Sequence, residues 1–390
     1  MASKNLIFVL NLHCPYIKVT QNDFSAYEAE SSFVFLQMSN LFLPTLDLLS
    51  LLKEKKLEAK IGLVFSASVC EILTDPELKK RYNKWLDNLI ELGKKEVARA
   101  KKNSAVLKIA LANLERAKED KRKFNEVWDG ELLQAFASFA NQGYAEILAT
   151  CGTYLFMPHF ADMTEILNAQ VESGLVAVKR HFGQASDGFF LPEMGYAPGI
   201  ESVIKSYGFA YTLLPSQSFL FAELSPLKGI FMPARTQNGL SILAANEIPQ
   251  DYYNLGLYRD ASKDLAWELS GKELSPFIKE GRARSRTFWS YVNRDDEPYD
   301  FLAAASKARS DADAFVQGKA ELLKKAQVVL GDDADVFECF VFNAIDICFA
   351  WPEFFEWFSQ ALLSCSDHGL KISSPYSQVR GQFGAQKISP

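Results

Sequence analysis

The chain has 390 residues, of which 48% are hydrophobic and 23% are charged, and its net charge at pH 7 is −6. This globular composition is enough for a large core, while the acidic charge argues against nucleic acid as partner and gives no sign of attraction to a membrane. The six cysteines show no CxxC spacing, which indicates buried free thiols in a reducing compartment, so we expect a cytoplasmic protein.

Short apolar runs alternate with amphipathic stretches along the chain, and none of these runs approaches transmembrane length. We expect buried strands at residues 6–10, 61–66, 145–150, 188–191, 210–214 and 229–232, and a late strand-like run at 336–349. Helical patterns cover residues 41–57, 163–182, 198–207 and 352–363. Strands that alternate with helices favour a parallel sheet with right-handed crossovers, here within a single unit of residues 1–390.

Two charged, mostly helical excursions interrupt this alternation. Residues 75–128 carry two apolar stripes, one of them including Tyr82 and Trp85, and predict a helical hairpin laid on the sheet. Residues 255–330 form the second excursion, which contains a polar, turn-rich segment. The end of the chain, residues 373–390, is rich in Ser, Gly and Gln and has little to bury, so we expect it to be loosely ordered.

Glu193 follows an apolar run directly, in the sequence Phe-Leu-Pro-Glu-Met-Gly-Tyr at residues 190–196. Pro192 has no N–H to give to a central strand ladder, so the strand should end there, and Gly195 should allow a sharp turn. A carboxylate then lies at the C-terminal tip of a strand, where α/β barrels and open α/β sheets keep their catalytic groups. For this motif alone, a strand-ending glutamate that faces solvent is the alternative interpretation.

Three further segments place polar side chains where an apolar run ends. They contribute His13, Tyr154 and Asp346, which together with Glu193 put an imidazole, a phenol and two carboxylates at one edge of the expected sheet. Each also has a structural interpretation: His13 as a satisfied core histidine, and Asp346 as the partner of a helix N-terminus. The four histidines are scattered, without His-x-His or His-x-x-x-His spacing, so we expect no metal and no cofactor.

The chain resembles glycoside hydrolase family 57, because its motifs follow one another along the sequence in the order in which that family carries them. The α-glucan-active members of the family include amylases, 4-α-glucanotransferases and branching enzymes. The segments that carry the resemblance are Asn-Leu-His-Cys-Pro-Tyr at residues 11–16, the motif around Glu193, and Asn-Ala-Ile-Asp-Ile-Cys at 343–348. Tyr-Arg-Asp at residues 258–260 and Glu-Pro-Tyr-Asp at 297–300 extend it over nearly the whole chain, and it is closest to the branching enzymes.

The resemblance implies an incomplete (β/α)7 barrel, which is a distorted TIM-like fold with helical insertions. It also implies a retaining mechanism with Glu193 as nucleophile and Asp346 as general acid/base, their carboxyl groups roughly 5–5.5 Å apart. Further substrate contacts are implied for a set of polar and aromatic residues: Asn11, His13, Tyr16, Tyr154, Tyr196 and Trp351. Tyr16 and Tyr196 could equally be packing residues.

The chain departs from the family at the expected site. Asn11 and Tyr154 stand where the family has histidines, and Cys348 stands where it has a glutamate. The loss of that glutamate removes a carboxylate that would help to position Asp346 and set its pKa.

Two hypotheses therefore remain. The first is a retaining hydrolase or glucanotransferase that acts on α-1,4-glucan or maltooligosaccharides through a covalent glycosyl-enzyme. The second is a catalytically impaired relative that binds glucan or a protein partner. The choice between hydrolysis and transfer, the glucan linkage and the oligomeric state all stay open at this point.

Overall fold

A sheet of parallel strands forms the centre of the computed structural model, which describes residues 2–15, 33–222, 226–246, 257–260, 292–344, 346–380 and 386–387. The strands that make the barrel are β1 (Lys4–Asn11), β2 (Ile61–Val64), β3 (Ala145–Thr150), β4 (Phe189–Phe190), β5 (Tyr211–Pro215), β7 (Ser241–Asn246) and β8 (Val336–Asn343). They follow one another in the order β4-β3-β2-β1-β8-β7-β5, and every neighbouring pair is parallel.

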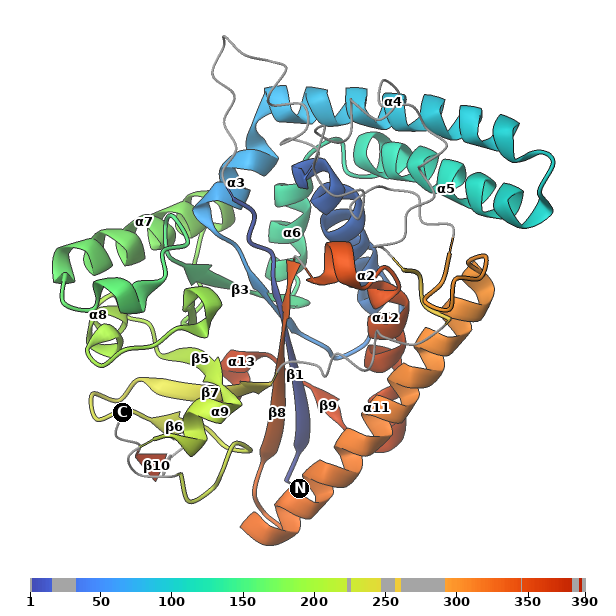
Figure 1. Cartoon of the computed structure of the whole chain (residues 1–390). Helices are drawn as coiled ribbons and strands as arrows, with labels where there is room; N and C mark the ends of the chain where they lie inside the picture. The colour runs from blue at the N-terminus through green and yellow to red at the C-terminus, as the bar shows by residue number, and fades with distance from the viewer. Residues whose placement is uncertain are drawn as a thin grey trace.

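One bridge, between Gly188 and Tyr211, connects the two edges of this sheet. The barrel is held closed by few strand-pairing contacts, because β4 has two residues and β7 meets β8 through only two paired positions. The seven strands thus nearly close into a barrel surrounded by helices (Figure 1), which confirms the expected incomplete (β/α)7 barrel.

The strands are buried on both faces. Ile7 and Val9 of β1 pack in an inner cluster with Leu213 of β5 and Val341 of β8, while Leu6 and Phe8 face the helices in an outer cluster. Burial on both faces is the reason why these strands are continuous apolar runs rather than alternating patterns.

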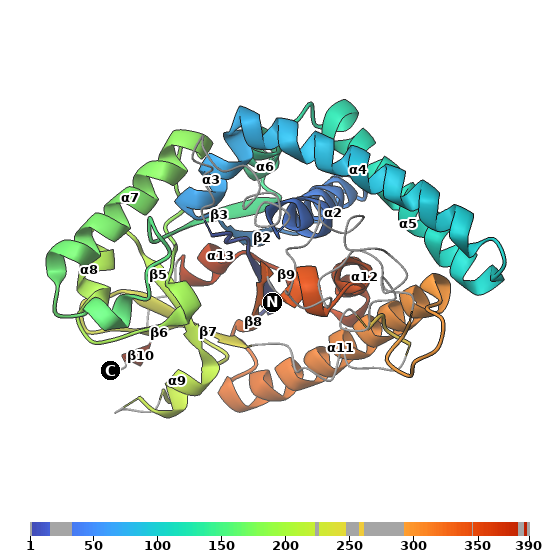
Figure 2. The ribbon, with the colours of Figure 1, turned by 45° about the horizontal axis from the view of Figure 1, so that its top comes forward.

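The longer helices of the described residues surround the barrel (Figure 2), and short helical segments lie at its two ends. These helices and helical segments are η1 (Met38–Phe42), α2 (Leu43–Glu54), α3 (Ala67–Thr74), α4 (Pro76–Ala100), α5 (Ser104–Arg122), η2 (Lys123–Val127), α6 (Leu132–Asn141), η3 (Met157–Phe160), α7 (Thr164–Phe182), η4 (Pro192–Met194), α8 (Ile200–Ser206), α9 (Ser216–Leu220), α11 (Phe301–Leu330), η8 (Asp346–Ala350), α12 (Phe354–Ser364), η9 (Ser366–His368) and α13 (Pro375–Val379). Three short strands complete the chain: β6 (Ala234–Arg235), β9 (Lys371–Ile372) and β10 (Gln386–Lys387).

The expected helical hairpin is present as α4 and α5, which lie across the end of the molecule toward which β1 and β8 run (Figure 1). Each helix begins at a side-chain cap: Asp75 accepts from two backbone N–H groups of α4, and Asn103 accepts from two of α5. The predicted stripe is buried, and Tyr82 packs edge-on against Phe124 at 4.9 Å between ring centroids.

The second excursion is anchored by buried hydrogen bonds. Tyr258 donates to Asp311 of α11, within the excursion, at 2.7 Å. The backbone N–H of Arg259 and the hydroxyl of Tyr299 donate to Glu353, next to α12, at 2.9 and 2.6 Å. The Tyr-Arg-Asp and Glu-Pro-Tyr-Asp segments that extended the family resemblance therefore attach this excursion to the barrel wall. Residues 261–291 of it lie outside the described residues.

Two expectations about strands were wrong. Residues 229–232 form a turn and a bend, although Ile230 and Phe231 pack against the core, and the strand nearby is β6. The strand-like run from 336 ends at Asn343, and the helical turn η8 follows it. In both places the apolar residues reflect packing against the barrel rather than strand pairing. β7 was missed, because small residues dominate its sequence Ser-Ile-Leu-Ala-Ala-Asn.

The end of the chain is held more firmly than its composition suggested. Val379 of α13 belongs to the inner barrel cluster, and the backbone N–H of Tyr376 donates to Glu146 near the start of β3 at 3.2 Å. Residues 373–380 thus pack at the amino ends of the strands, contrary to the expectation of a loosely ordered tail in this part.

No apolar run of membrane-spanning length was expected, yet one described helical segment, Phe33–Glu54, is long and apolar enough for a span by length and composition. In the structure 72% of its most apolar window is buried inside the protein, as in the core helix of a folded domain.

Candidate active site

Polar side chains gather at the carboxyl ends of neighbouring barrel strands. Asn11 ends β1 and Asn343 ends β8; the two are paired in register, and the Asn11 amide donates to the Asn343 side chain at 3.0 Å. Ser66 follows β2, Tyr154 follows β3 and Glu193 follows β4. We call this group of strand ends the barrel mouth.

Glu193 lies in a tight left-handed turn directly after β4. Its φ is 54° and that of Met194 is 50°, and the N–H of Met194 donates to the carbonyl of Leu191 at 2.8 Å. Such conformations are uncommon for residues other than glycine and are often found at functional sites. The glutamate side chain itself is exposed.

Gly195 plays a different part from the one expected. Its φ is −74°, so the sharp turn is made by Glu193 and Met194 and not by the glycine. A Cβ at Gly195 would lie 2.3 Å from a ring carbon of Phe156. A side chain here would therefore have to displace the Phe156 ring, which comes from the loop after β3 and packs directly on this backbone.

Tyr154 connects the residues of the barrel mouth. Its φ is 56°, its ring stacks on the His13 ring with centroids 3.7 Å apart, and its hydroxyl accepts from the Asn11 amide at 2.6 Å. The same hydroxyl is hydrogen-bonded to Glu193. Burial, with the nearby negative charge of Glu193, raises the pKa of Tyr154, so its proton stays in place to be donated to the carboxylate.

His13 is held as a neutral group. Its Nδ1 lies 2.9 Å from the Ser66 hydroxyl, and burial lowers the pKa of the imidazole to about 4. Ser66 in turn contacts Ser68, which donates to the carbonyl of Cys14 at 2.6 Å. Ser66 and Asn343 were not singled out from the sequence; Ser66 ends the expected strand 61–66, whereas Asn343 lies inside the expected run 336–349 and ends the strand only in the structure.

Asp346 begins η8, immediately beyond the end of β8, and its side chain is exposed. Cys348, where the family resemblance would place a glutamate, is buried, and burial raises the pKa of its thiol well above the usual value. A neutral buried thiol carries no negative charge, so it cannot stabilise the proton of Asp346 as a carboxylate in that place would.

The remaining expected contacts do not join this cluster. The Tyr196 hydroxyl donates to Glu201 of α8 at 2.8 Å. Trp351 is 4% exposed, packs against Phe354 and Trp357, and lines a separate cavity. Tyr16 lies outside the described residues. The structure therefore brings together Asn11, His13, Tyr154 and Glu193.

The chemistry available at the barrel mouth is that of carboxylates. Glu193 is exposed and hydrogen-bonded to Tyr154, and Asp346 is an exposed carboxylate beyond a nearby strand end. Two such groups can serve as nucleophile and general acid/base. Among the described residues, no group of three His, Cys, Asp or Glu side chains could hold a metal ion.

Comparison with known proteins identifies the family. The model of glycosyl hydrolase family 57 matches residues 7–388. The chain is 22% identical over 318 residues to the 1,4-alpha-glucan branching enzyme of Thermococcus kodakarensis, an alignment that covers 70% of this chain but only 45% of that enzyme.

Solved structures show the same fold. The α-amylase AmyC from Thermotoga maritima superposes with a TM-score of 0.88 at 21% identity, covering 100% of this chain and 77% of that one. The branching enzyme from Pyrococcus horikoshii superposes with a TM-score of 0.82 at 19% identity, covering 99% and 72%. Because the family model spans almost the whole chain, this protein belongs to glycosyl hydrolase family 57.

Proposed function

We propose that this protein is an α-glucan-active retaining enzyme, either a hydrolase or a glucanotransferase, with Glu193 as nucleophile and Asp346 as general acid/base. The observation that carries the proposal is the exposed Glu193 carboxylate at the barrel mouth, held in a left-handed turn and hydrogen-bonded to Tyr154. Membership of family 57 and the similarity to a branching enzyme and an amylase support the substrate class.

In this mechanism Glu193 attacks the anomeric carbon while Asp346 donates its proton to the leaving glycosidic oxygen. The glycosyl group is then carried on the Glu193 carboxylate. Asp346, now ionised, takes a proton from a water molecule or from a sugar hydroxyl, which attacks the same carbon and releases the product. Water gives hydrolysis and a sugar hydroxyl gives transfer. His13, neutral near pH 7, can contribute hydrogen bonds but no positive charge.

The proposal is tested by turnover of amylose and maltoheptaose with the Glu193→Gln variant. We expect turnover to fall by about 10³-fold or more, because the amide cannot form the glycosyl-enzyme. Glu172→Gln, an exposed glutamate on α7, is the matched control and should keep its turnover. Turnover that survives Glu193→Gln would remove Glu193 from the mechanism.

Cys348 favours one second candidate, a relative that binds glucan without turning it over. The buried thiol leaves Asp346 without the carboxylate that the family motif would supply. Calorimetry with maltoheptaose separates the two proposals, since binding without any turnover supports the second and binding with turnover supports the first.

We further propose that the protein works in a reducing compartment such as the cytoplasm. All six cysteines are buried free thiols, which supports this assignment.

A further inference from the structure

A cavity of about 450 Å³ lies between the helical hairpin and the barrel wall. Its sides come from η1 and α2, from α4 and α5, and from η8 and α12. This volume is within the range of pockets that bind small molecules. None of Asn11, His13, Tyr154 and Glu193 lines it. The cavity is therefore distinct from the barrel mouth, although Ile347 and Cys348 of η8 form part of its wall.

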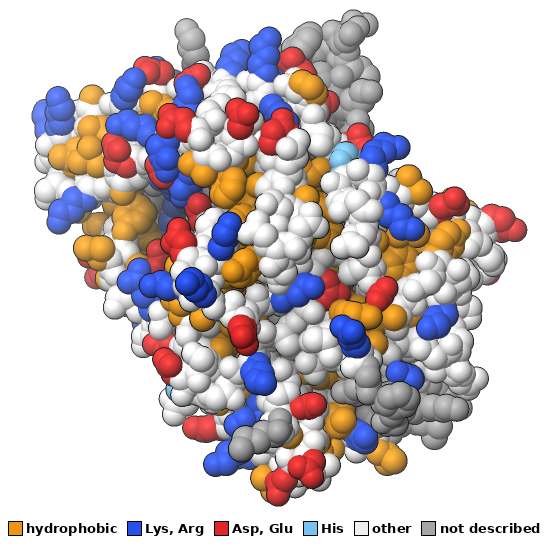
Figure 3. All heavy atoms as spheres, turned by 180° about the vertical axis from the view of Figure 1, so that it is seen from behind, with side chains coloured by type: hydrophobic (Ala, Val, Ile, Leu, Met, Phe, Trp, Pro, Cys, Tyr) orange, Lys and Arg blue, Asp and Glu red, His pale blue; other side chains and the backbone are white. Residues whose placement is uncertain are grey.

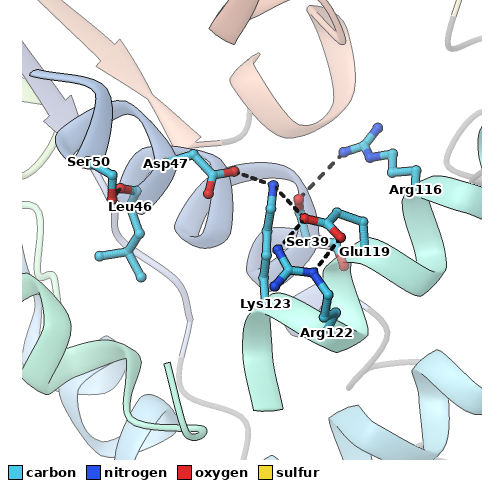
Figure 4. A network of polar contacts seen from close by, with 8 residues as sticks. All are labelled: Ser39, Leu46, Asp47, Ser50, Arg116, Glu119, Arg122 and Lys123. Carbon is cyan, nitrogen blue, oxygen red and sulfur yellow. Dashed lines mark hydrogen bonds and ion pairs between the residues drawn. The ribbon is translucent and has the colours of Figure 1, made fainter. Parts of the chain in front are cut away.

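The charged side chains that line the cavity are nearly balanced in sign, with Asp47, Glu119, Asp120 and Glu356 against Arg116, Lys123 and Arg259. Glu119 and Glu356 also pair with Arg122 and Arg309, which lie outside the wall. Lys123 of η2 pairs with Asp47 of α2 at 2.7 Å and lies 3.9 Å from Glu119 of α5. Arg116 reaches the carbonyl of Ser39 (Figure 4). It also donates to the Asn40 side chain at 2.6 Å. Fixed pairs of this kind offer hydrogen-bond donors and acceptors without an excess charge that would select an ion.

Asn113 of α5 supplies an unused hydrogen-bond donor. Its side chain lines the cavity and is 6% exposed, and its amide nitrogen has no hydrogen-bond partner among the residues that the structure describes. Buried polar groups are nearly always hydrogen-bonded, and one that is not calls for a partner. An acceptor oxygen on a molecule in the cavity would supply it.

Much of the rest of the wall is apolar and aromatic, and it includes Trp85 of α4, Trp351 and, from α12, Phe355. Aromatic walls combined with neutral, hydrogen-bonding polar groups suit an uncharged ligand that carries many hydroxyl groups. On the opposite face of the molecule from that of Figure 1, acidic and basic side chains are similarly interspersed rather than gathered by sign (Figure 3).

We infer that this cavity is a second carbohydrate site, which binds a short segment of a neutral oligosaccharide next to η8, the turn that begins with Asp346. The choice of an α-glucan as the oligosaccharide rests on the proposed function. The balance of charges around the cavity and the unpaired Asn113 amide do not depend on the proposed function. A sugar bound here would touch the turn that carries the proposed general acid/base.

The test is a titration of the full-length Glu193→Gln protein with maltotriose, followed by calorimetry and by tryptophan fluorescence. Asn113→Leu removes the donor at nearly constant volume, and Ser359→Trp, at a half-buried position of the cavity wall on α12, fills the space. Asn125→Leu, an exposed position of the same hairpin outside the cavity, is the matched control. We expect Asn113→Leu to weaken one class of maltotriose sites by about tenfold, as the loss of one hydrogen bond does. Ser359→Trp should weaken the same class at least as much because it occupies the space, and the control should bind like the parent.

Unchanged maltotriose binding in both cavity variants, each folded by circular dichroism, would overturn the inference. Ser359→Trp alone decides the question if Asn113→Leu does not fold. Amylose turnover by the unmodified protein reports on the proposed function separately. Turnover without any effect of the cavity variants refutes only the cavity, whereas cavity-dependent binding without turnover keeps the cavity and refutes the enzyme.

Discussion

Tyr154 touches the three other residues that meet at the barrel mouth. Its ring stacks on His13, and its hydroxyl lies between the Asn11 amide and the Glu193 carboxylate. Because the amide nitrogen of Asn11 can only donate, the hydroxyl proton is directed toward Glu193. Asn11 and Tyr154 both stand where family histidines were expected, and the hydrogen bond between them shows that the two replacements fit each other.

Replacing Tyr154 with phenylalanine should therefore lower kcat while leaving the fold intact. The variant keeps the ring stack on His13 but removes the hydroxyl that is hydrogen-bonded to Glu193, and misplacement of a reacting group can cost about 10²-fold. Steady-state turnover of maltoheptaose measures the effect. Tyr207→Phe is the control, since its hydroxyl donates to the carbonyl of Asn168 on the outer helices. Equal kcat values for the two variants would contradict a role for Tyr154.

His13 gives a prediction about stability and pH. Burial lowers its pKa to about 4 in the folded state, against 6.5 for the free side chain. Between these values the unfolded chain binds a proton that the folded protein does not. The stability that the neutral imidazole gives the folded protein is therefore complete above about pH 6.5 and is lost as the pH falls toward 4.

We expect the advantage of the parent over His13→Gln in free energy of unfolding to shrink on acidification. This difference should change by at most about 1.4 kcal/mol per pH unit. The change is smaller if solvent reaches the ring and weakens the effect of burial. Urea unfolding of both proteins at pH 7, 6, 5 and 4 gives the difference between their free energies of unfolding. Titrating groups that both proteins share contribute equally to each, so they cancel in this difference. A difference that is independent of pH would show that the imidazole titrates normally.

At the scale of elements, the end of β3 and helix α7 are in direct backbone contact. A Cβ on Gly174 of α7 would lie 1.7 Å from the carbonyl oxygen of Thr150, the last residue of β3. Thr150 in turn donates its hydroxyl to the carbonyl of Phe190 in β4 at 2.7 Å. This contact sets the position from which the chain departs toward Tyr154 and, through β4, toward Glu193.

Gly174→Ala should therefore destabilise the protein by about 1–3 kcal/mol, as overpacking does. Gly318→Ala is its matched counterpart, because Gly318 lies on the exposed side of α11, away from both ends, and a methyl group there would meet no atom within 4 Å among the described residues. That change should stabilise by roughly 0.5–1 kcal/mol, since alanine favours the helix. Chemical denaturation midpoints should shift in opposite directions, and a shift of the same sign would refute the packing argument.

At the scale of the whole molecule, the barrel holds residues from distant parts of the chain in one shell. The first strand pairs with β8 along its entire length, and α13, near the end of the chain, packs into the inner cluster beneath them. Next to the hairpin α4–α5, Lys123 of η2 pairs with Asp47 of α2, and the cavity lies between these helices and η8. The alignment to the branching enzyme spans 45% of that protein, so the similarity between the two sequences covers only part of that enzyme.

The sequence by itself indicated a parallel sheet with helices and the helical hairpin, and its resemblance to family 57 implied the barrel. Buried parallel strands are apolar on both faces, so their runs are visible directly, and the position of Glu193 follows from the apolar run that stops before Pro192. Capping residues such as Asp75 and Asn103 likewise act within a few positions of the helices that they begin. These features depend on neighbours in the chain, which a single sequence records.

Only the tertiary structure decided how the barrel mouth is built. Asn11 and Tyr154 are 143 positions apart, Asn11 and Asn343 are 332 apart, and both hydrogen bonds exist because the sheet places β8, β1, β2 and β3 side by side. The same applies to the left-handed turn at Glu193, to Phe156 packing on Gly195, and to Trp351 lining a different cavity. Backbone strain and contacts between distant residues are set by packing around the whole barrel, and local sequence carries no record of them.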